Sequence, residues 1–274
     1  MDCSRPASKK SLGQRFLVSD SVANRIVGAL SPVRGELVFE IGPGRGALTF
    51  PLADRGAEVV AYEIDSSLAE LLEERCSGRK NIEIINADIR DVDLDAAAAE
   101  RDRKHYKIVG NIPYHLTSTI LLDLPRWKGS GSNVLMVQRE VGERINSKPG
   151  DRNCGILTIF LRSYFDIATV MRVRPGSFSP RPKVESVVLR FSVKESEGAP
   201  SDREGFLAFL KLAFSQRRKK LRTALRGSAG MIDAKMVLRL AELSGVDMNL
   251  RPEELELEAW FELFGRFEEI KERR

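Results

Sequence analysis

The chain has 274 residues, of which 42% are hydrophobic and 30% are charged. This composition supports a buried core and excludes a wholly disordered protein. Apolar runs all fall short of the roughly 20 residues that a membrane-spanning helix needs, and the first residues lack the apolar segment of a signal peptide. We therefore expect a cytoplasmic protein with no membrane partner. The net charge of +5 is by itself only a weak indication of nucleic-acid binding.

The cysteines and histidines are few and scattered. Cys3, Cys76 and Cys154 form no C-x-x-C pair, and His105 and His115 have no metal-ligand spacing. This pattern argues against a disulfide framework and a zinc site, and it fits a reducing compartment. We expect no metal cofactor.

Apolar residues from position 20 to position 193 alternate between helical and extended spacing. Such alternation predicts an α/β domain whose mostly parallel sheet has helices on both faces, with ligands at the carboxyl ends of the strands. The predicted helices cover 20–30, 47–55, 66–75, 117–124 and 157–164, and the predicted strands cover 36–41, 58–62, 82–85, 106–110, 133–138, 167–173 and 184–193.

The strand pattern stops near residue 194. Residues 1–11 are polar and basic and predict a flexible arm, and 195–202 are polar with Gly and Pro and predict a linker. The α/β domain then covers 12–194. A small helical domain is predicted over 203–274, with helices over 203–226, 234–244 and 253–273.

A glycine-rich segment, Gly42-Pro43-Gly44-Arg45-Gly46, follows the first of these strands, and Glu63 ends the next one. Glycines allow a ligand to approach the backbone, and a carboxylate at a strand tip can accept hydrogen bonds from ribose hydroxyls. The G-x-G-x-G spacing and the proline favour S-adenosylmethionine over a dinucleotide. The alternative is an ordinary glycine-rich turn.

Asp88 follows the third predicted strand. Its carboxylate is placed to accept a hydrogen bond from the adenine amine of the same cofactor. The alternative is a helix cap or a loop aspartate, which is common.

Asn111-Ile112-Pro113-Tyr114 follows the fourth predicted strand and is the most informative segment. An exocyclic adenine amine is a poor nucleophile, and two hydrogen-bond acceptors would orient it toward a methyl donor. The Asn111 side chain supplies one acceptor, and the carbonyl of Ile112 or Pro113 supplies the other. Pro113 restricts the backbone, and Tyr114 offers a ring that can stack on a base. The alternative is a simple turn.

Residues 206–232 contain no acidic residue, whereas the segment after residue 252 is rich in glutamate. This segregation suits contacts with RNA phosphates, although a solvated charged face is the common alternative. The candidate RNA contacts are Arg217, Arg218, Lys219, Lys220 and Arg222.

Together these motifs resemble the ribosomal RNA adenine dimethyltransferases of the KsgA type, over nearly the whole chain. The matching segments are 11–17, 40–44, Glu63, Asp88, 111–114, 178–186, and Arg251-Pro252 followed by Trp260.

The resemblance implies a Rossmann-like class I methyltransferase sheet with a C-terminal helical domain that contacts RNA. It implies S-adenosylmethionine-dependent dimethylation of N6 of two adjacent adenosines in a loop near the 3′ end of small-subunit ribosomal RNA. It also implies a role in ribosome biogenesis, on a pre-30S-type particle, and we expect a monomer.

The resemblance also implies roles for single residues. Phe178 is expected to stack on the target base, although a buried core position is the alternative. At position 15 the family pattern has Asn or His, so the role of Arg15 is an open question. The implied cofactor contacts are Arg15, Leu17, Gly42, Gly44, Glu63, Asp88 and Asn111, and the implied catalytic residues are Asn111, Pro113 and Tyr114.

Two other functions remain possible from the sequence. A macrolide-resistance methyltransferase that acts on large-subunit ribosomal RNA shares the N-x-P-Y motif, but the complete C-terminal helical domain argues against it. A ribosome-assembly factor could use the same fold without catalysis, but the intact segment 111–114 favours retained activity.

Overall fold

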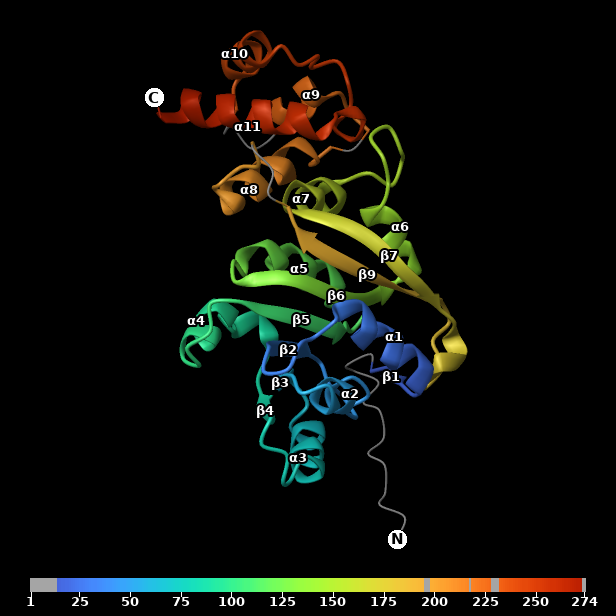
Figure 1. Ribbon diagram of the computed structural model, residues 1–274. Coiled ribbons are helices and arrows are strands. Elements are labelled where there is room, and N and C mark those ends of the chain that lie inside the picture. The colour runs from blue at the N-terminus through green and yellow to red at the C-terminus, as the bar shows by residue number, and fades with distance from the viewer. Residues whose placement is uncertain (1–13, 195–197, 217, 228–231, 273–274) are drawn as a thin grey trace. The chain divides into compact units, whose positions relative to one another are not determined.

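The computed structural model describes residues 14–194, 198–216, 218–227 and 232–272 (Figure 1). The chain forms two compact units. The first comprises Met1–Gly142 and Asp166–Val193, and the second comprises Glu143–Phe165 and Lys194–Arg274. Residues 143–165, which the sequence analysis placed in the α/β domain, thus belong to the second unit. The predicted arm lies outside the described residues, as does part of the predicted linker.

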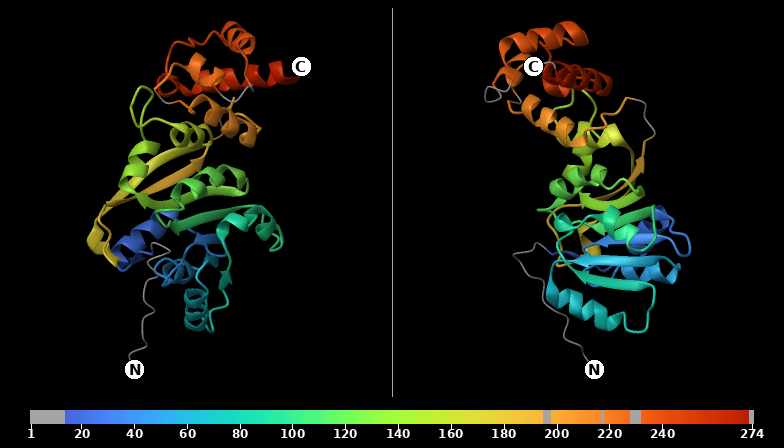
Figure 2. Two further views of the ribbon diagram at one scale, coloured as in Figure 1. Left: turned by 180° about the vertical axis from the view of Figure 1, so that it is seen from behind. Right: turned by 90° about the vertical axis from the view of Figure 1, so that its left-hand side faces the viewer.

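A seven-stranded sheet in the order β4-β3-β2-β5-β6-β9-β7 forms the centre of the first unit (Figures 1 and 2). Neighbouring strands from β4 to β6 are parallel, and β9 is antiparallel to β6. Each parallel connection needs a crossover, which explains the alternation in the sequence. The strands are β2 (Leu37–Ile41), β3 (Glu58–Glu63), β4 (Ile82–Asn86), β5 (Tyr106–Asn111), β6 (Ser130–Gln138), β7 (Phe165–Val173) and β9 (Ser186–Val193).

Helices of the first unit bury one apolar side. In α1, Ser19 accepts a hydrogen bond from the backbone N–H of Val22 and so begins the helix, while Ile26, Val27 and Leu30 enter the core. The short α4 and α6 were not predicted. The helices are α1 (Asp20–Leu30), α2 (Thr49–Asp54), α3 (Ser66–Arg75), α4 (Leu94–Ala99) and α5 (Thr117–Asp123), with 3-10 turns η2 (Ile89–Asp91), η3 (Leu124–Arg126) and η4 (Pro175–Ser177). The division between the units falls within α6 (Arg139–Ile145), after Gly142.

A second, two-stranded sheet was also not predicted. β1 (Phe16–Leu17) pairs antiparallel with β8 (Phe178–Ser179), with Phe16 opposite Ser179 and Leu17 opposite Phe178. Both strands contain two residues, so no periodicity marks them in the sequence. This pairing attaches the start of the described chain to the segment that joins β7 to β9.

Aromatic rings fill the core of the second unit. Phe206 and Phe264 have ring centroids 5.3 Å apart, and Phe214 stacks on Trp260 at 5.6 Å. Phe160 of α7 packs against Phe206, which explains why residues 143–165 group with this unit. The elements are α7 (Ile156–Tyr164), α8 (Arg203–Ala213), α9 (Leu221–Arg226), α10 (Ala234–Ser244), η5 (Pro252–Glu254) and α11 (Leu257–Glu272).

The helix predicted over 203–226 is interrupted between α8 and α9. The backbone N–H groups of Leu221 and Arg222 donate to the carbonyls of Leu250 and Met248. A continuous helix would direct these donors to its own preceding turn, so the long-range bonds fix a new helix start. Among the described helices, none is long and apolar enough to cross a membrane.

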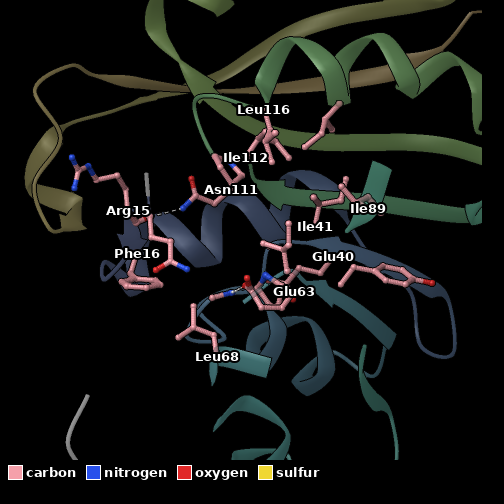
Figure 3. Close-up of a pocket in the computed structure, with 18 of the residues that line it drawn as sticks. Arg15, Phe16, Glu40, Ile41, Glu63, Leu68, Ile89, Asn111, Ile112 and Leu116 are labelled. Atoms are coloured by element: carbon pink, nitrogen blue, oxygen red, sulfur yellow. Dashed lines mark hydrogen bonds between the residues drawn. The ribbon is translucent and has the colours of Figure 1, made fainter. Parts of the chain in front are cut away.

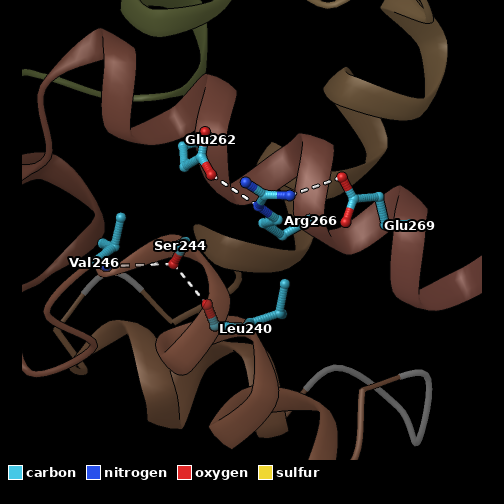
Figure 4. A network of polar contacts seen from close by, with 6 residues as sticks. All are labelled: Leu240, Ser244, Val246, Glu262, Arg266 and Glu269. Atoms are coloured by element: carbon cyan, nitrogen blue, oxygen red, sulfur yellow. Dashed lines mark hydrogen bonds and ion pairs between the residues drawn. The ribbon is translucent and has the colours of Figure 1, made fainter.

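Hydrogen bonds cap the end of α10, and ion pairs link side chains along α11 (Figure 4). The Ser244 hydroxyl donates to the carbonyl of Leu240 at 2.6 Å and accepts from the N–H of Val246 at 3.3 Å. On α11, Arg266 pairs with Glu262 at 2.8 Å and with Glu269 at 2.9 Å. These i, i+3 and i, i+4 pairs offset part of the repulsion within an acidic helix.

The close approach of β2 to β5 yields a stability prediction. A Cβ atom at Gly110 would lie 2.8 Å from the Ile41 carbonyl oxygen, so Gly110→Ala must push these strands apart. We expect a loss of about 1–3 kcal/mol in the free energy of unfolding, measured by urea denaturation. Gly131→Ala is the control, because no atom lies within 4 Å of its added Cβ. Equal stabilities of the two variants would contradict the prediction.

Candidate active site

A cavity opens where the parallel strands of the sheet end (Figure 3). Its walls come from the loops after β2, β3, β4 and β5, because the carboxyl ends of parallel strands meet at one edge. β1 contributes a further wall. The predicted residues that line it are Arg15, Leu17, Gly42, Gly44, Glu63, Asp88, Asn111, Pro113 and Tyr114.

Glu63 is fixed by the glycine loop. Its Oε2 accepts a hydrogen bond from the backbone N–H of Gly44, and its Oε1 accepts one from that of Asp65, each at 3.0 Å. Gly42 and Gly44 have positive φ angles of 66° and 55°, which only glycine adopts without strain. Each carboxylate oxygen keeps a further acceptor position for a ligand hydroxyl. Burial raises the pKa of Glu63, and the backbone donors of Asp65, Gly44 and Ile64 oppose that shift.

Glu40 is a second buried carboxyl in the cavity wall, and sequence reasoning did not assign it to the site. It is 1% exposed, and its Oε2 has no hydrogen-bond partner among the described residues. Burial raises the pKa of Glu40 to about 8, the nearby Thr49 hydroxyl opposes the shift, and the charge of Glu63 adds to it. At neutral pH, Glu40 is therefore mostly protonated and uncharged.

Asp88 follows β4 and accepts a 3.0 Å hydrogen bond from the backbone N–H of Arg90, so it caps η2. The Arg90 guanidinium also donates to both carboxylate oxygens of Asp88. This hydrogen bonding holds the pKa of Asp88 below its usual range. A charged acceptor thus stands in the cavity wall, together with an arginine that sequence reasoning did not assign to the site.

The Asn111 side chain is held in one orientation. Its Nδ2 donates to the backbone carbonyl of Arg15 at 2.8 Å (Figure 3), and its Oδ1 has no partner among the described residues. The carbonyl of Pro113 already accepts from the N–H of Leu116 at 3.0 Å and from the Thr117 hydroxyl at 3.2 Å. Pro113 is therefore a poor second acceptor.

Tyr114 is tethered at the end of its ring. Its hydroxyl lies 3.1 Å from the hydroxyl of Ser186, at the start of β9. Ser186 is fully buried, so this hydrogen bond links the ring that lines the cavity to the sheet.

Phe178 differs from its expected role. It is 4% exposed, belongs to the hydrophobic core cluster and is absent from the cavity wall. It lies opposite Leu17 in the antiparallel pairing of β8 with β1. The core position, which the sequence analysis gave as the alternative, is what the structure has.

Gln14 and Phe16, which are sequence neighbours of the predicted cofactor contacts Arg15 and Leu17, also line the cavity. Gln14 donates to Asp65 at 3.1 Å, and the Phe16 ring lies so close to Gly44 that an added Cβ would be 3.0 Å away. The Arg45 guanidinium carbon lies 4.3 Å from the centre of the Phe16 ring. Gln14 and Phe16 both belong to the matching segment 11–17, which was the signal that could have identified them.

Of the predicted RNA contacts, Arg218, Lys219 and Lys220 lie between α8 and α9, and Arg222 lies in α9. Arg218, Lys219, Lys220 and Arg222 are exposed, whereas Arg217 lies outside the described residues.

Comparison with known proteins identifies the family. The sequence model described as "Ribosomal RNA adenine dimethylase" matches residues 6–269, nearly the whole chain. The chain belongs to this family. A "Ribosomal RNA small subunit methyltransferase A" of Koribacter versatilis is 39% identical over 96% of this chain and 95% of the relative. The protein of the same description from Acidobacterium capsulatum is 38% identical over 95% of this chain and 92% of the relative.

Solved structures agree with this family. A dimethyladenosine transferase from Plasmodium falciparum has a TM-score of 0.78 and 26% identity, and the match covers 93% of this chain and 98% of that one. The 23S rRNA methyltransferase ErmE has a TM-score of 0.64 and 28% identity, over 92% and 99% of the two chains. The predicted family, the Rossmann-like methyltransferase fold and the enzyme class are therefore confirmed.

Glu40 makes stability depend on pH. Between the ordinary carboxyl pKa of 4.5 and about 8, the folded protein retains a proton that the unfolded chain releases. The free energy of unfolding should therefore fall by about 1.4 kcal/mol per pH unit in this window through Glu40 alone. Glu40→Gln should lose this dependence, so it should gain stability relative to the natural protein as the pH rises from 5 to 8.

Urea denaturation at several pH values measures this difference. Glu70→Gln on the exposed side of α3 is the matched control. A constant difference between Glu40→Gln and the natural protein from pH 5 to pH 8 would rule out a protonated Glu40.

Proposed function

We propose that this enzyme dimethylates N6 of two adjacent adenosines in a loop near the 3′ end of small-subunit ribosomal RNA and acts in ribosome biogenesis. The observation that carries the proposal is the fixed Asn111 amide, whose Oδ1 is free at the cavity wall. The relatives described as small-subunit methyltransferases support the choice of substrate.

The donor and acceptor set of the cavity fits S-adenosylmethionine, which supplies an electrophilic methyl group when bound. Glu63 holds the ribose hydroxyls with the acceptor positions left free by Gly44 and Asp65. Asp88 would accept from the adenine amine in exchange for part of its contact with the Arg90 guanidinium, which engages both carboxylate oxygens. Glu40 adds a buried polar atom without a partner, as expected where a polar ligand completes the wall. Gly42, Gly44, Arg15 and Leu17 provide close backbone contacts.

Asn111 and Ile112 orient the target amine. The Asn111 Oδ1 accepts from one amine hydrogen, and the Ile112 carbonyl accepts from the other. Ile112 is preferred over Pro113 because the Pro113 carbonyl is already engaged by Leu116 and Thr117. Both acceptors also stabilise the positive charge that develops on the nitrogen during transfer.

Tyr114 stacks on the target base in this arrangement, and its hydrogen bond to Ser186 keeps the ring in place. Pro113 shapes the turn between the two acceptors and the ring. Stacking of Phe178 on the other face of the base would require this residue to leave the core.

We further propose that the substrate is RNA within a pre-30S-type particle and that the enzyme works as a monomer in the cytoplasm. The exposed basic residues of the second unit, Arg218, Lys219, Lys220 and Arg222, contact RNA phosphates there.

The substrate assignment is tested with tritiated S-adenosylmethionine and purified subunits from a strain that lacks this methylation. Label should appear in small-subunit RNA, as dimethyladenosine. Label confined to large-subunit RNA would refute the proposed substrate and favour the function that ErmE represents. The absence of label from both subunits would favour the non-catalytic assembly role.

Asn111→Ala should reduce the rate of methyl transfer at least about 100-fold, because one preorganised contact to the reacting amine contributes roughly 3 kcal/mol. RNA affinity should stay within about threefold, because phosphate contacts dominate RNA binding. Single-turnover kinetics and filter binding measure the two effects. Asn249→Ala, in an exposed loop of the second unit, is the control. Unchanged turnover in Asn111→Ala would contradict the role of Asn111.

Replacing Arg218, Lys219 and Lys220 together by Ala should weaken RNA binding and reduce its salt dependence. Three lost phosphate contacts should lower the slope of log Kd against log salt by about 2. The control replaces Lys235, Arg239 and Lys271, which are also exposed in the same unit. Equal slopes for the two variants would show that the first set does not touch phosphate.

A further inference from the structure

A second basic segment belongs to the first unit, whereas the predicted RNA contacts belong to the second unit. Residues 167–184 contain no acidic residue. Their four basic side chains are exposed, and none of them has a hydrogen bond or ion pair with another described residue. We call this set the basic rim, and it consists of Arg172, Arg174, Arg181 and Lys183.

The basic rim belongs to a segment that pairs with a strand of the cavity wall. It runs from the end of β7 through β8 to the loop before β9, and β8 pairs with β1. The backbone N–H of Val18 also donates to the carbonyl of Ser177 at 2.9 Å. Because Leu17 lines the cavity, the segment that pairs with it lies next to the cavity wall. Figures 1 and 2 show this yellow segment beside β1 and α1.

Arg15 adds a fifth cation at the same place. It directly precedes Phe16, which pairs with Ser179, so it lies beside the start of the loop that carries Arg181. Only its backbone carbonyl is used, by Asn111. Its side chain points away from Asn111 (Figure 3), and it has no partner among the described residues.

Little of the positive charge of the basic rim is neutralised by acidic side chains of the same segment. Glu185, the acidic residue that ends the segment, is paired with Arg139 at 3.1 Å. Arg172 lies near the end of β7, and Arg174 follows directly after the strand with an extended backbone. Both are exposed and flank the buried Val173, so they face the same side, with Cα atoms roughly 7 Å apart because each extended residue advances about 3.3 Å. Guanidinium groups in such a row suit a chain of phosphates, which they bind without distinguishing bases.

We propose that Arg15 and the basic rim bind the RNA backbone that flanks the base held in the cavity. This inference rests on the proposed function, because an RNA base must enter the cavity. A base extruded from a single-stranded loop brings its neighbouring phosphates to the cavity mouth. The rim therefore positions the strand on the catalytic unit itself.

The test replaces Arg172, Arg174, Arg181 and Lys183 together by Ser in the full chain. The probe is a synthetic RNA hairpin whose loop contains adjacent adenosines, and binding is measured over a range of salt concentrations. We expect RNA affinity to fall at least tenfold. We also expect the slope of log Kd against log salt to decrease by about 3, since each phosphate contact on a single strand contributes about 0.7.

The matched control replaces Arg34, Arg55, Lys80 and Lys104 by Ser. These residues are exposed, lack side-chain partners among the described residues, and lie just before β2, β3, β4 and β5, at the opposite edge of the sheet. The control removes the same charge, so it should keep the natural salt slope.

The affinity for S-adenosylhomocysteine, measured by calorimetry, should be the same in the rim variant and the natural protein. Equal affinities would show that the cavity of the rim variant remains folded. If the rim variant and the control variant have the same salt slope, the rim does not bind RNA phosphates and the proposal is overturned. This conclusion holds whether the rim binds a protein instead or has no ligand. This result does not depend on which subunit is methylated. Label in large-subunit RNA with a reduced salt slope would refute the proposed substrate and retain the rim.

Discussion

The hydrogen bond from Asn111 Nδ2 to the Arg15 carbonyl determines what the cavity can do. An amide can present either its oxygen or its nitrogen, and only the oxygen can accept from an amine. With Nδ2 engaged by backbone, the oxygen is the group left for a ligand. The bond also joins the residue before β1 to the end of β5, so the same contact orients the Asn111 side chain and closes one wall of the cavity.

The two buried carboxyl groups of the cavity, Glu63 and Glu40, differ in their hydrogen-bond donors and therefore in the form that is favoured. Glu63 is surrounded by backbone donors, which stabilise its charged form. Glu40 lacks such donors at Oε2, and its burial favours the protonated form. Two adjacent carboxylates would repel each other in a site of low polarity, so a neutral Glu40 allows Glu63 to stay available as an acceptor.

Features that depend on local spacing could be predicted from the sequence alone, such as the glycine loop, the position of Glu63 at the end of β3 and the turn after β5. It was insufficient where distant residues decide the structure. The strands β1 and β8 exist only through their mutual pairing, and the engagement of the Pro113 carbonyl depends on where α5 begins. No sequence motif indicates that Arg90 contacts Asp88. Phe178 matched a family segment, but its burial follows from the same β1–β8 pairing.

The β1–β8 pairing also bears on how the protein is made. One wall of the cavity depends on residues at the beginning of the described chain meeting residues 178 and 179. During synthesis this contact waits until the later strand has emerged from the exit tunnel, since non-local pairing forms after the intervening chain. A nascent chain that stops before β8 contains the glycine loop and the segment 111–114, yet it lacks the strand that holds β1 in place. The complete wall of the cavity therefore forms late in translation.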